Sequence, residues 1–285
     1  LPFLFFSEMW ERFRYYLMIG IFLLYLKNVE HGFAMTNSEA SDLYGTFIAL
    51  VFLTPFIGGL LADRYFGYRR SIIAGGIMMG VGYCMMAVHS LPMLYLSMAL
   101  VIFGNGFFKP NISTLLGNLY SAPEFIHRKD EGYNIFYMGI NVGAFICNFF
   151  SAAIIIIWGW KYAFVAAGVG MFLGVIIFMA GTKHYANGDV RKPMTKEDMP
   201  FSKIVLTIFI PAIIAGILGW IIPKNIFGSD STDAFIFACI PVIYFYTSLY
   251  MRAEASEKRP IAALLAIFAA VVMFWAVFKQ NGTAL

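Results

Sequence analysis

Residues 3–26 read FLFFSEMWERFRYYLMIGIFLLYL, an apolar stretch whose charged residues are gathered in its first half. A helix needs about 20 mostly apolar residues to cross the hydrocarbon core of a bilayer, so this stretch is long enough to span a membrane. Its acidic and basic side chains exclude a cleavable signal peptide, because the hydrophobic region of such a peptide carries no charge. We therefore expect a membrane-spanning helix that stays in the mature protein.

Eight further stretches have a similar length and apolar character, at 42–62, 71–88, 91–119, 132–158, 162–182, 204–222, 234–251 and 261–285. The composition agrees, with 60% hydrophobic residues, 13% charged residues and a mean hydropathy of +0.75. A soluble domain carries about 25% charged residues. Because the backbone in lipid must be satisfied within helices or closed barrels, we expect an all-α polytopic membrane protein with nine spans.

The basic residues divide unequally between the two sets of loops when the N-terminus is placed in the cytoplasm. The cytoplasmic loops then receive Arg64, Arg69, Arg70, Arg128, Lys129, Lys183, Arg191, Lys192, Lys196, Lys203, Arg252, Lys258 and Arg259, and the opposite loops receive Lys27, Lys161 and Lys224. Cytoplasmic loops carry an excess of Lys and Arg, so we expect a multi-pass protein of the inner (plasma) membrane with a cytoplasmic N-terminus. No basic run indicates a nucleic-acid partner.

The charges of the first stretch share one helical face with two tyrosines. Helical spacing places Glu8 and Arg12 on the same side as Tyr15, with Tyr16 beside them. Glu11 stands four residues before Tyr15, which makes the two neighbours on a helix. A charge at the membrane centre costs about 2.5–3.5 kcal/mol on insertion scales, so we expect this group to face a cavity. The alternative is a structural salt-bridge knot, although ion pairing alone seldom offsets its desolvation.

A second constellation lies in the 91–119 stretch, where residues 104–113 read GNGFFKPNIS. Lys109 stands too deep in this stretch for its side chain to reach an interface easily. It therefore requires a carboxylate, which either Glu8 and Glu11 or a substrate would supply. Pro110 removes one backbone donor and can open the helix at this point.

Residues 59–70 read GLLADRYFGYRR, a tight turn with an acid at a helix end and bases beyond it. This pattern is similar to the cytoplasmic signature of the major facilitator superfamily. The resemblance implies that Asp63, Arg64 and Arg70 latch helices in one conformation and so act in gating. Without the resemblance the same residues describe an ordinary basic loop, which the positive-inside bias generates by itself.

Four segments together resemble the proton-dependent oligopeptide transporters, the peptide branch of the major facilitator superfamily. They are Glu8-x-x-Glu11-Arg12-Phe13-x-Tyr15-Tyr16, FKPNIS at 108–113, FYMGINVGA at 136–144 and FWA at 274–276. The resemblance extends over almost the whole chain. It implies an N-terminal six-helix bundle at 1–182, a cytoplasmic linker with an inserted two-helix hairpin at 183–259, and the first helix of a C-terminal bundle at 260–285. We expect that the remainder of that second bundle is missing.

The resemblance also implies a function, which is proton-coupled import of di- and tripeptides by alternating access. It implies a transporter and not an enzyme, with protons as the coupling ion, the lipid bilayer as surroundings, and no metal or organic cofactor. Glu8 and Glu11 would respond to protons together with Arg12 and Lys109, and the latter two would receive the carboxylate of the peptide. Asn141 would hold the amino end, and the pocket would be shaped by Tyr15, Tyr16, Phe52 and Trp275.

Three positions depart from the pattern of that family. Lys279 stands where an acid is common, Phe52 stands where many members have a tyrosine, and Arg14 adds a cation to the first stretch. The intramembrane balance is then Arg12, Arg14, Lys109 and Lys279 against Glu8 and Glu11. This surplus of positive charge suits an anion-rich substrate, or an acid in the missing half balances it. A transporter of nitrate or another small anion with the same fold is therefore the alternative function.

Overall fold

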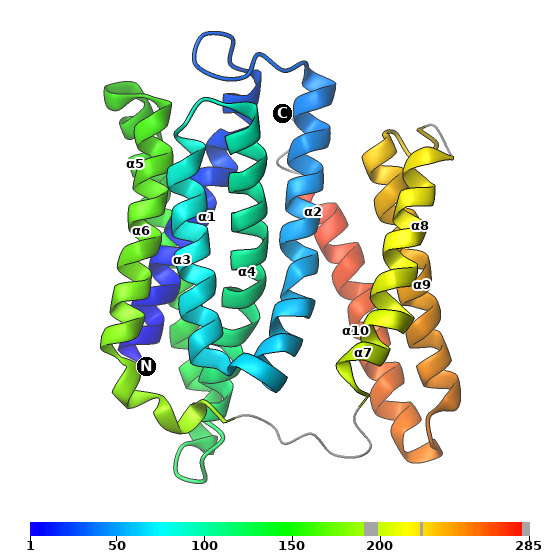
Figure 1. Cartoon of the computed structure of the whole chain (residues 1–285). Coiled ribbons are helices and arrows are strands. Elements are labelled where there is room, and N and C mark those ends of the chain that lie inside the picture. Colours follow the sequence, from blue (N-terminus) through cyan, green and yellow to red (C-terminus); the bar gives the residue numbers. More distant parts are fainter. Residues whose placement is uncertain (191–198, 223–224, 281–285) are drawn as a thin grey trace. The chain divides into compact units, whose positions relative to one another are not determined.

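The computed structural model describes residues 1–190, 199–222 and 225–280, apart from the side chains of 272 and 275–280. These residues form helices and no strand, which confirms the all-α prediction (Figure 1). The chain divides into two compact units, Leu1–Lys196 and Glu197–Leu285. Helices occupy the positions of all nine predicted stretches within the described ranges.

Unit 1 is a bundle of six long helices: α1 Pro2–Lys27, α2 Asn37–Leu61, α3 Tyr68–Met86, α4 Leu91–Leu119, α5 Lys129–Trp158 and α6 Trp160–Ala180. The α1 helix packs against α5 and α6, while α3 packs against α4 and α6, and α2 packs against α4. Glycines let these backbones approach closely, as small residues do between membrane helices. A Cβ atom at Gly75 of α3 would lie 2.5 Å from the carbonyl oxygen of Gly104 in α4.

The α2 helix begins five residues earlier than the sequence predicts, at Asn37 instead of 42. Thr36 and Glu39 form a capping box, in which the Glu39 amide donates to Oγ1 of Thr36 at 3.3 Å and the Thr36 amide donates to Oε2 of Glu39 at 2.9 Å. Such caps satisfy backbone donors that the first turn leaves unpaired. Polar residues thus extend this helix beyond its apolar stretch.

Unit 2 contains a helical hairpin followed by one further helix. The first arm consists of α7 Phe201–Ile204, a π-helical segment Val205–Phe209 and α8 Ile210–Ile221, and the second arm is α9 Asp230–Arg252. Buried Asp233 closes the connection, because its carboxylate accepts from the amides of Ile226 and Phe227 at 2.9 and 2.7 Å. The last helix, α10, runs from Ala255 to Gln280.

Six helical segments of the described chain are long and apolar enough to cross a membrane. They are Asn37–Phe66, Leu91–Leu119, Ile126–Trp158, Trp160–Ala180, Phe201–Ile221 and Asp230–Arg252. The prediction of a multi-pass membrane protein is therefore confirmed. Three helices at predicted spans, α1, α3 and α10, are not among the six, although the 26 residues of α1 are long enough. The α1 helix is set apart by its charged residues. It carries the buried charges that make up the candidate site.

The polar connection after α6 is predicted to separate two parts of the chain, yet its first residues pack against unit 1. The carboxylate oxygen Oδ1 of Asp189 accepts from the amides of Tyr68 and Arg69 at 2.8 and 3.2 Å. It thereby caps the N-terminus of α3, which has no side-chain cap of its own. In addition, Asn118 of α4 donates to the Gly188 carbonyl at 3.1 Å.

Tyr185 anchors the same connection. Its ring stacks on Phe178 with centroids 4.8 Å apart, and its hydroxyl donates to the Phe178 carbonyl. Burial raises the pKa of the Tyr185 phenol, so the group remains a neutral donor. Residues 181–190 therefore behave as part of the bundle.

Replacing Asp189 by alanine is expected to lower the free energy of unfolding by about 0.5–2 kcal/mol, the usual cost of a lost N-cap. Asp189→Asn keeps an acceptor oxygen at the same place and is expected to retain most of the stability. Thermal unfolding of the purified protein, with hydrogen exchange at the Tyr68 and Arg69 amides, measures both effects. Equal protection of these amides in the alanine variant and the parent would contradict the capping role.

Candidate functional site

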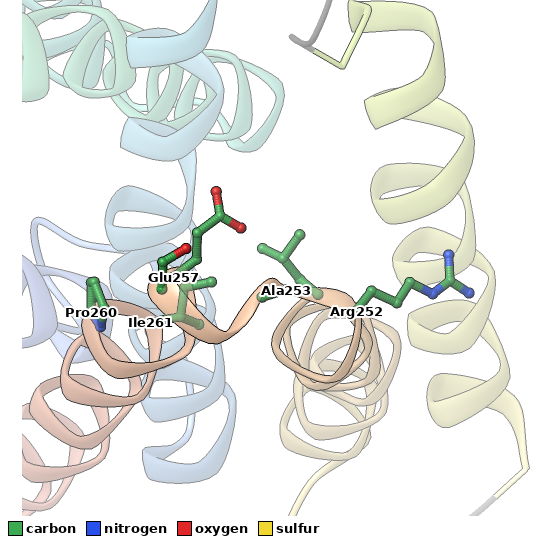
Figure 2. Close-up of a pocket in the computed structure, with 7 residues that line it drawn as sticks. Arg252, Ala253, Glu257, Pro260 and Ile261 are labelled. Carbon is green, nitrogen blue, oxygen red and sulfur yellow. The ribbon is translucent and has the colours of Figure 1, made fainter.

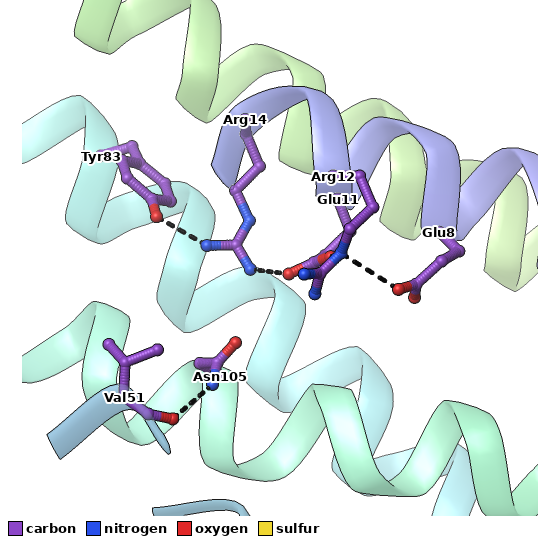
Figure 3. Close-up of polar contacts among 7 residues, drawn as sticks. All are labelled: Glu8, Glu11, Arg12, Arg14, Val51, Tyr83 and Asn105. Atoms are coloured by element: carbon purple, nitrogen blue, oxygen red, sulfur yellow. Dashed lines mark hydrogen bonds and ion pairs between the residues drawn. The ribbon is translucent and has the colours of Figure 1, made fainter. Parts of the chain in front are cut away.

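Four charged side chains of α1 point into unit 1 at the middle of the bundle (Figure 3). Glu8, Glu11, Arg12 and Arg14 are 3%, 0%, 5% and 1% exposed. The neighbouring helices approach this part of α1 through glycines. A Cβ atom at Gly143 of α5 would lie 3.1 Å from that of Arg12, and the fold therefore seals the charges from lipid on this side.

The four charges form a chain of ion pairs. The Nε atom of Arg12 lies 3.1 Å from Oε1 of Glu8 and also pairs with Oε2 of Glu11. The Nη2 atom of Arg14 pairs with Oε1 of Glu11. Glu11 thus uses both carboxylate oxygens and lies between two guanidinium groups, whereas Glu8 uses one oxygen.

Three polar atoms of this chain of ion pairs are buried with neither a hydrogen bond nor an ion pair among the described residues, namely Oε2 of Glu8, Nη2 of Arg12 and Nε of Arg14. Buried polar groups in folded proteins are nearly always hydrogen-bonded. An incompletely satisfied cluster therefore has the capacity to bind a ligand or water. The guanidinium carbon of Arg12 also lies 5.0 Å from the ring centroid of Tyr15, which is buried beside it.

Arg14 is held from a second helix. Its Nη1 atom donates to the hydroxyl of Tyr83 in α3 at 2.6 Å, and its guanidinium carbon lies 5.2 Å from the centroid of that ring. The sequence alone indicates no partner for Arg14, because Tyr83 lies 69 residues away. With two acids and two bases the α1 cluster is formally balanced.

Lys109 of α4 is a further cation close to the α1 cluster. Its Nζ atom lies 5.0 Å from the ring centroid of Phe52 in α2, and it interacts electrostatically with Glu8, Glu11 and Arg12. Among the described residues no carboxylate lies within 4.0 Å of this nitrogen. The sequence offers two sources of a carboxylate for Lys109, which are the α1 acids and a substrate. Lys109 forms no direct ion pair with Glu8 or Glu11 in this structure.

Hydrogen bonds between α2 and α4 fix Lys109 and Phe52 in place. Nδ2 of Asn105 donates to the Val51 carbonyl at 2.8 Å (Figure 3), and Oγ1 of Thr54 donates to the Ile102 carbonyl at 2.8 Å. Both polar residues are buried in apolar helices. Their polarity within an apolar stretch is the sequence signal that would have identified them as positioning residues.

Asn141 and Tyr16 take no part in the ion pairs of this cluster. Asn141 is exposed and its side chain forms no hydrogen bond with any described residue, and Tyr16 is 39% exposed. The side chains of Trp275 and Lys279 lie outside the described residues. The predicted roles of these four residues remain predictions.

The predicted gating residues lie at the turn between α2 and α3. The backbone forms a π-helical turn at Ala62–Phe66 and then a positive φ of 79° at Gly67. Asp63 and Arg64 are half-buried and Arg70 is exposed. No ion pair joins Asp63 to Arg70 in this described turn. Their gating role also stays a prediction.

A surface pocket of about 530 Å³ occurs in unit 2, where α9 ends and α10 begins (Figure 2). Arg252, Ala253, Glu257, Pro260 and Ile261 contribute to its lining. It contains none of the residues predicted to bind a substrate. The candidate site is therefore the α1 cluster with Lys109 and its α2–α4 support.

Known proteins resemble this chain over nearly its whole length. A family model described as the POT family matches residues 69–285. The chain is 36% identical over 292 residues to the uncharacterized transporter YclF of Bacillus subtilis, covering 99% of this chain and 58% of that protein. It is 30% identical over 294 residues to a di-/tripeptide transporter of Lactococcus lactis, covering 98% of this chain and 58% of that protein.

Solved structures give the same picture. The structure of peptide transporter POT in complex with sulfate is similar with a TM-score of 0.79 and 32% identity, covering 99% of this chain and 59% of that one. A POT family transporter in complex with 5-aminolevulinic acid is similar with a TM-score of 0.78 and 26% identity, at coverages of 98% and 59%. The chain therefore spans somewhat more than half the length of the proteins that it matches.

Proposed function

The chain belongs to the POT family, and from this premise we propose that it forms the N-terminal part of a proton-coupled symporter that imports di- and tripeptides by alternating access. In this proposal residues 1–182 form the first bundle. Residues 183–259 form the linker and inserted hairpin, and residues 260–285 begin the second bundle. The N-terminus lies in the cytoplasm and the protein resides in the inner (plasma) membrane.

The observation that carries the proposal is a buried chain of ion pairs next to Lys109, which has no direct counterion among the described residues. While Glu8 is ionised it holds Arg12, and when it takes up a proton the guanidinium group loses one of its two anionic partners. Arg12 and Lys109 can then bind the carboxylate of a substrate in a low-dielectric site, where such attraction is strong. Proton and substrate thus favour each other's binding by the same factor.

A small peptide fits the residues of this site better than an inorganic anion. Its carboxylate would meet Arg12 and Lys109, its amino end would meet Asn141, and its side chains would contact apolar and aromatic groups. The pocket would be completed by Tyr15, Tyr16, Phe52 and Trp275. The Lactococcus lactis relative is described as a di-/tripeptide transporter, and this description supports peptides ahead of nitrate as the substrate.

Uptake of labelled dialanine into liposomes that contain the complete transporter tests the proposal. An inward proton gradient is expected to drive accumulation, and a protonophore is expected to abolish it. Counterflow with labelled nitrate provides the matched control and is expected to remain at the level of empty liposomes. Accumulation of dialanine that ignores the gradient would contradict proton coupling, and nitrate counterflow without dialanine counterflow would contradict the substrate.

A further inference from the structure

The two carboxylates of α1 occupy unequal environments. Glu11 is 0% exposed and pairs with Arg12 through Oε2 and with Arg14 through Oε1. Glu8 pairs with Arg12 through Oε1 only, and its Oε2 takes part in no ion pair among the described residues. The difference between them is a single guanidinium group, that of Arg14.

The position of Arg14 is fixed by α3. Tyr83 accepts a hydrogen bond from Nη1 and presents its ring to the guanidinium group, so that Nη2 points to Glu11 (Figure 3). Both Arg14 and Tyr83 are almost completely buried, at 1% and 0% exposed. Tyr83 and Glu11 hold the planar guanidinium group of Arg14 from two sides, so the group keeps one orientation. A lysine in its place would be free to take several orientations.

The other helices around α1 add few charges to this region. Besides the cluster itself, Lys109 of α4 and Tyr83 of α3 interact electrostatically with Glu11, and Lys109 also interacts with Glu8. Tyr44 of α2 interacts with Tyr15. The α5 and α6 helices approach through the glycines Gly139, Gly143, Gly170 and Gly174, which have nothing to titrate. Arg14 is thus the cation that distinguishes the two acids.

We infer that Arg14, oriented by Tyr83, is a positioning residue that keeps Glu11 permanently ionised and so assigns proton uptake to Glu8. This inference rests on the proposed function, because it assigns the proton step of that symport to one carboxyl group. Glu11 then serves as a fixed counterion that holds Arg12 in place in both protonation states. Glu8 is the group whose neutralisation frees part of the Arg12 guanidinium for a substrate carboxylate.

Glu8 and Glu11 both pair with Arg12 and so compete for one cation. Without Arg14, Glu8 and Glu11 would share Arg12 as their only directly paired base among the described residues, and protonation of either would relieve the excess negative charge. An opposite charge within about 4–6 Å changes the titration of a carboxyl group by about one to three pH units. The direct ion pair with Arg14 is therefore expected to leave Glu8 as the first of the two acids to accept a proton.

Infrared difference spectroscopy of the complete transporter on acidification provides the test, because the carbonyl band of protonated carboxyl groups reports each acid. In the parent, Glu8→Gln is expected to remove a band and Glu11→Gln is not. In Arg14→Gln an additional band is expected, and the double variant Arg14→Gln/Glu11→Gln should lack it. The pH midpoint of dialanine uptake should rise by about one to three units in Arg14→Gln.

Two milder variants serve as controls for folding. Arg14→Lys retains a cation without its fixed orientation and is expected to show a weaker additional band than Arg14→Gln. Tyr83→Phe keeps the ring and should shift the midpoint in the same direction as Arg14→Gln but by less. A purely structural role of Arg14 would change stability without moving the bands. An Arg14→Gln spectrum equal to the parent, or loss of the parent band in Glu11→Gln, would overturn the inference. Absent gradient-driven uptake in the parent would instead refute the proposed function, and the band assignments would still test Arg14.

Discussion

Replacing Glu11 by alanine is expected to lower the free energy of unfolding by about 3–5 kcal/mol, the range found when one partner of a buried ion pair is removed. Glu11 is fully buried and pairs with both Arg12 and Arg14. Among the described residues its loss leaves Arg14 without an anionic partner and leaves Arg12 with Glu8 only. Among the ion pairs of the described residues, Glu11 is the one acid that pairs with two buried arginines.

A surface ion pair supplies the matched control for this prediction. Glu131 lies 3.4 Å from Arg128, and their side chains are 68% and 62% exposed. Exposed pairs contribute about 0–1 kcal/mol, so Glu131→Ala should leave stability almost unchanged. Denaturant unfolding in mixed micelles measures both variants. If Glu11→Ala and Glu131→Ala lowered the free energy of unfolding equally, burial of the α1 ion pairs would make no difference to stability.

Replacing Lys109 by glutamine is expected to weaken dialanine binding by about 10- to 100-fold while leaving stability close to that of the parent. The binding loss follows from removal of a charge-assisted hydrogen bond, which is worth about 1.5–3 kcal/mol. The small stability effect follows from the absence of any ion pair to Lys109 among the described residues. Competition binding and thermal unfolding of the same preparation measure the two quantities.

A peptide without a carboxylate distinguishes a direct contact from a general disturbance of the pocket. Dialanine amide should bind the parent and Lys109→Gln with similar affinity, because neither complex contains the lysine–carboxylate contact. Lys109→Arg retains the charge and is expected to recover part of the dialanine affinity. If Lys109→Gln weakened the amide and the free acid equally, the carboxylate assignment would be wrong.

The features that the sequence predicts well are local ones. The apolar stretches predict the helices, because length and apolarity alone decide whether a segment can cross a bilayer. The grouping of Glu8, Glu11 and Arg12 is also local, because residues three and four apart on a helix are neighbours. Both observations need no knowledge of how the helices pack.

The features that the sequence missed depend on packing between distant segments. The contact of Arg14 with Tyr83, the cap that Asp189 provides for α3 and the bond from Asn105 to Val51 join residues far apart in the chain. No periodicity within one helix contains this information. The sequence also does not predict that Asn141 is exposed. A helix that is apolar on most sides gives little indication of which face other helices cover.

The bonds between α2 and α4 have a mechanical consequence. The side chains of Asn105 and Thr54 donate to backbone carbonyls of the facing helix, and Gly58 and Gly106 bring the two backbones together. Sliding one helix past the other would break both bonds at once and leave buried polar groups unpaired, which is costly. The two helices are therefore expected to move together as one rigid unit, which keeps Lys109 and Phe52 at a fixed separation.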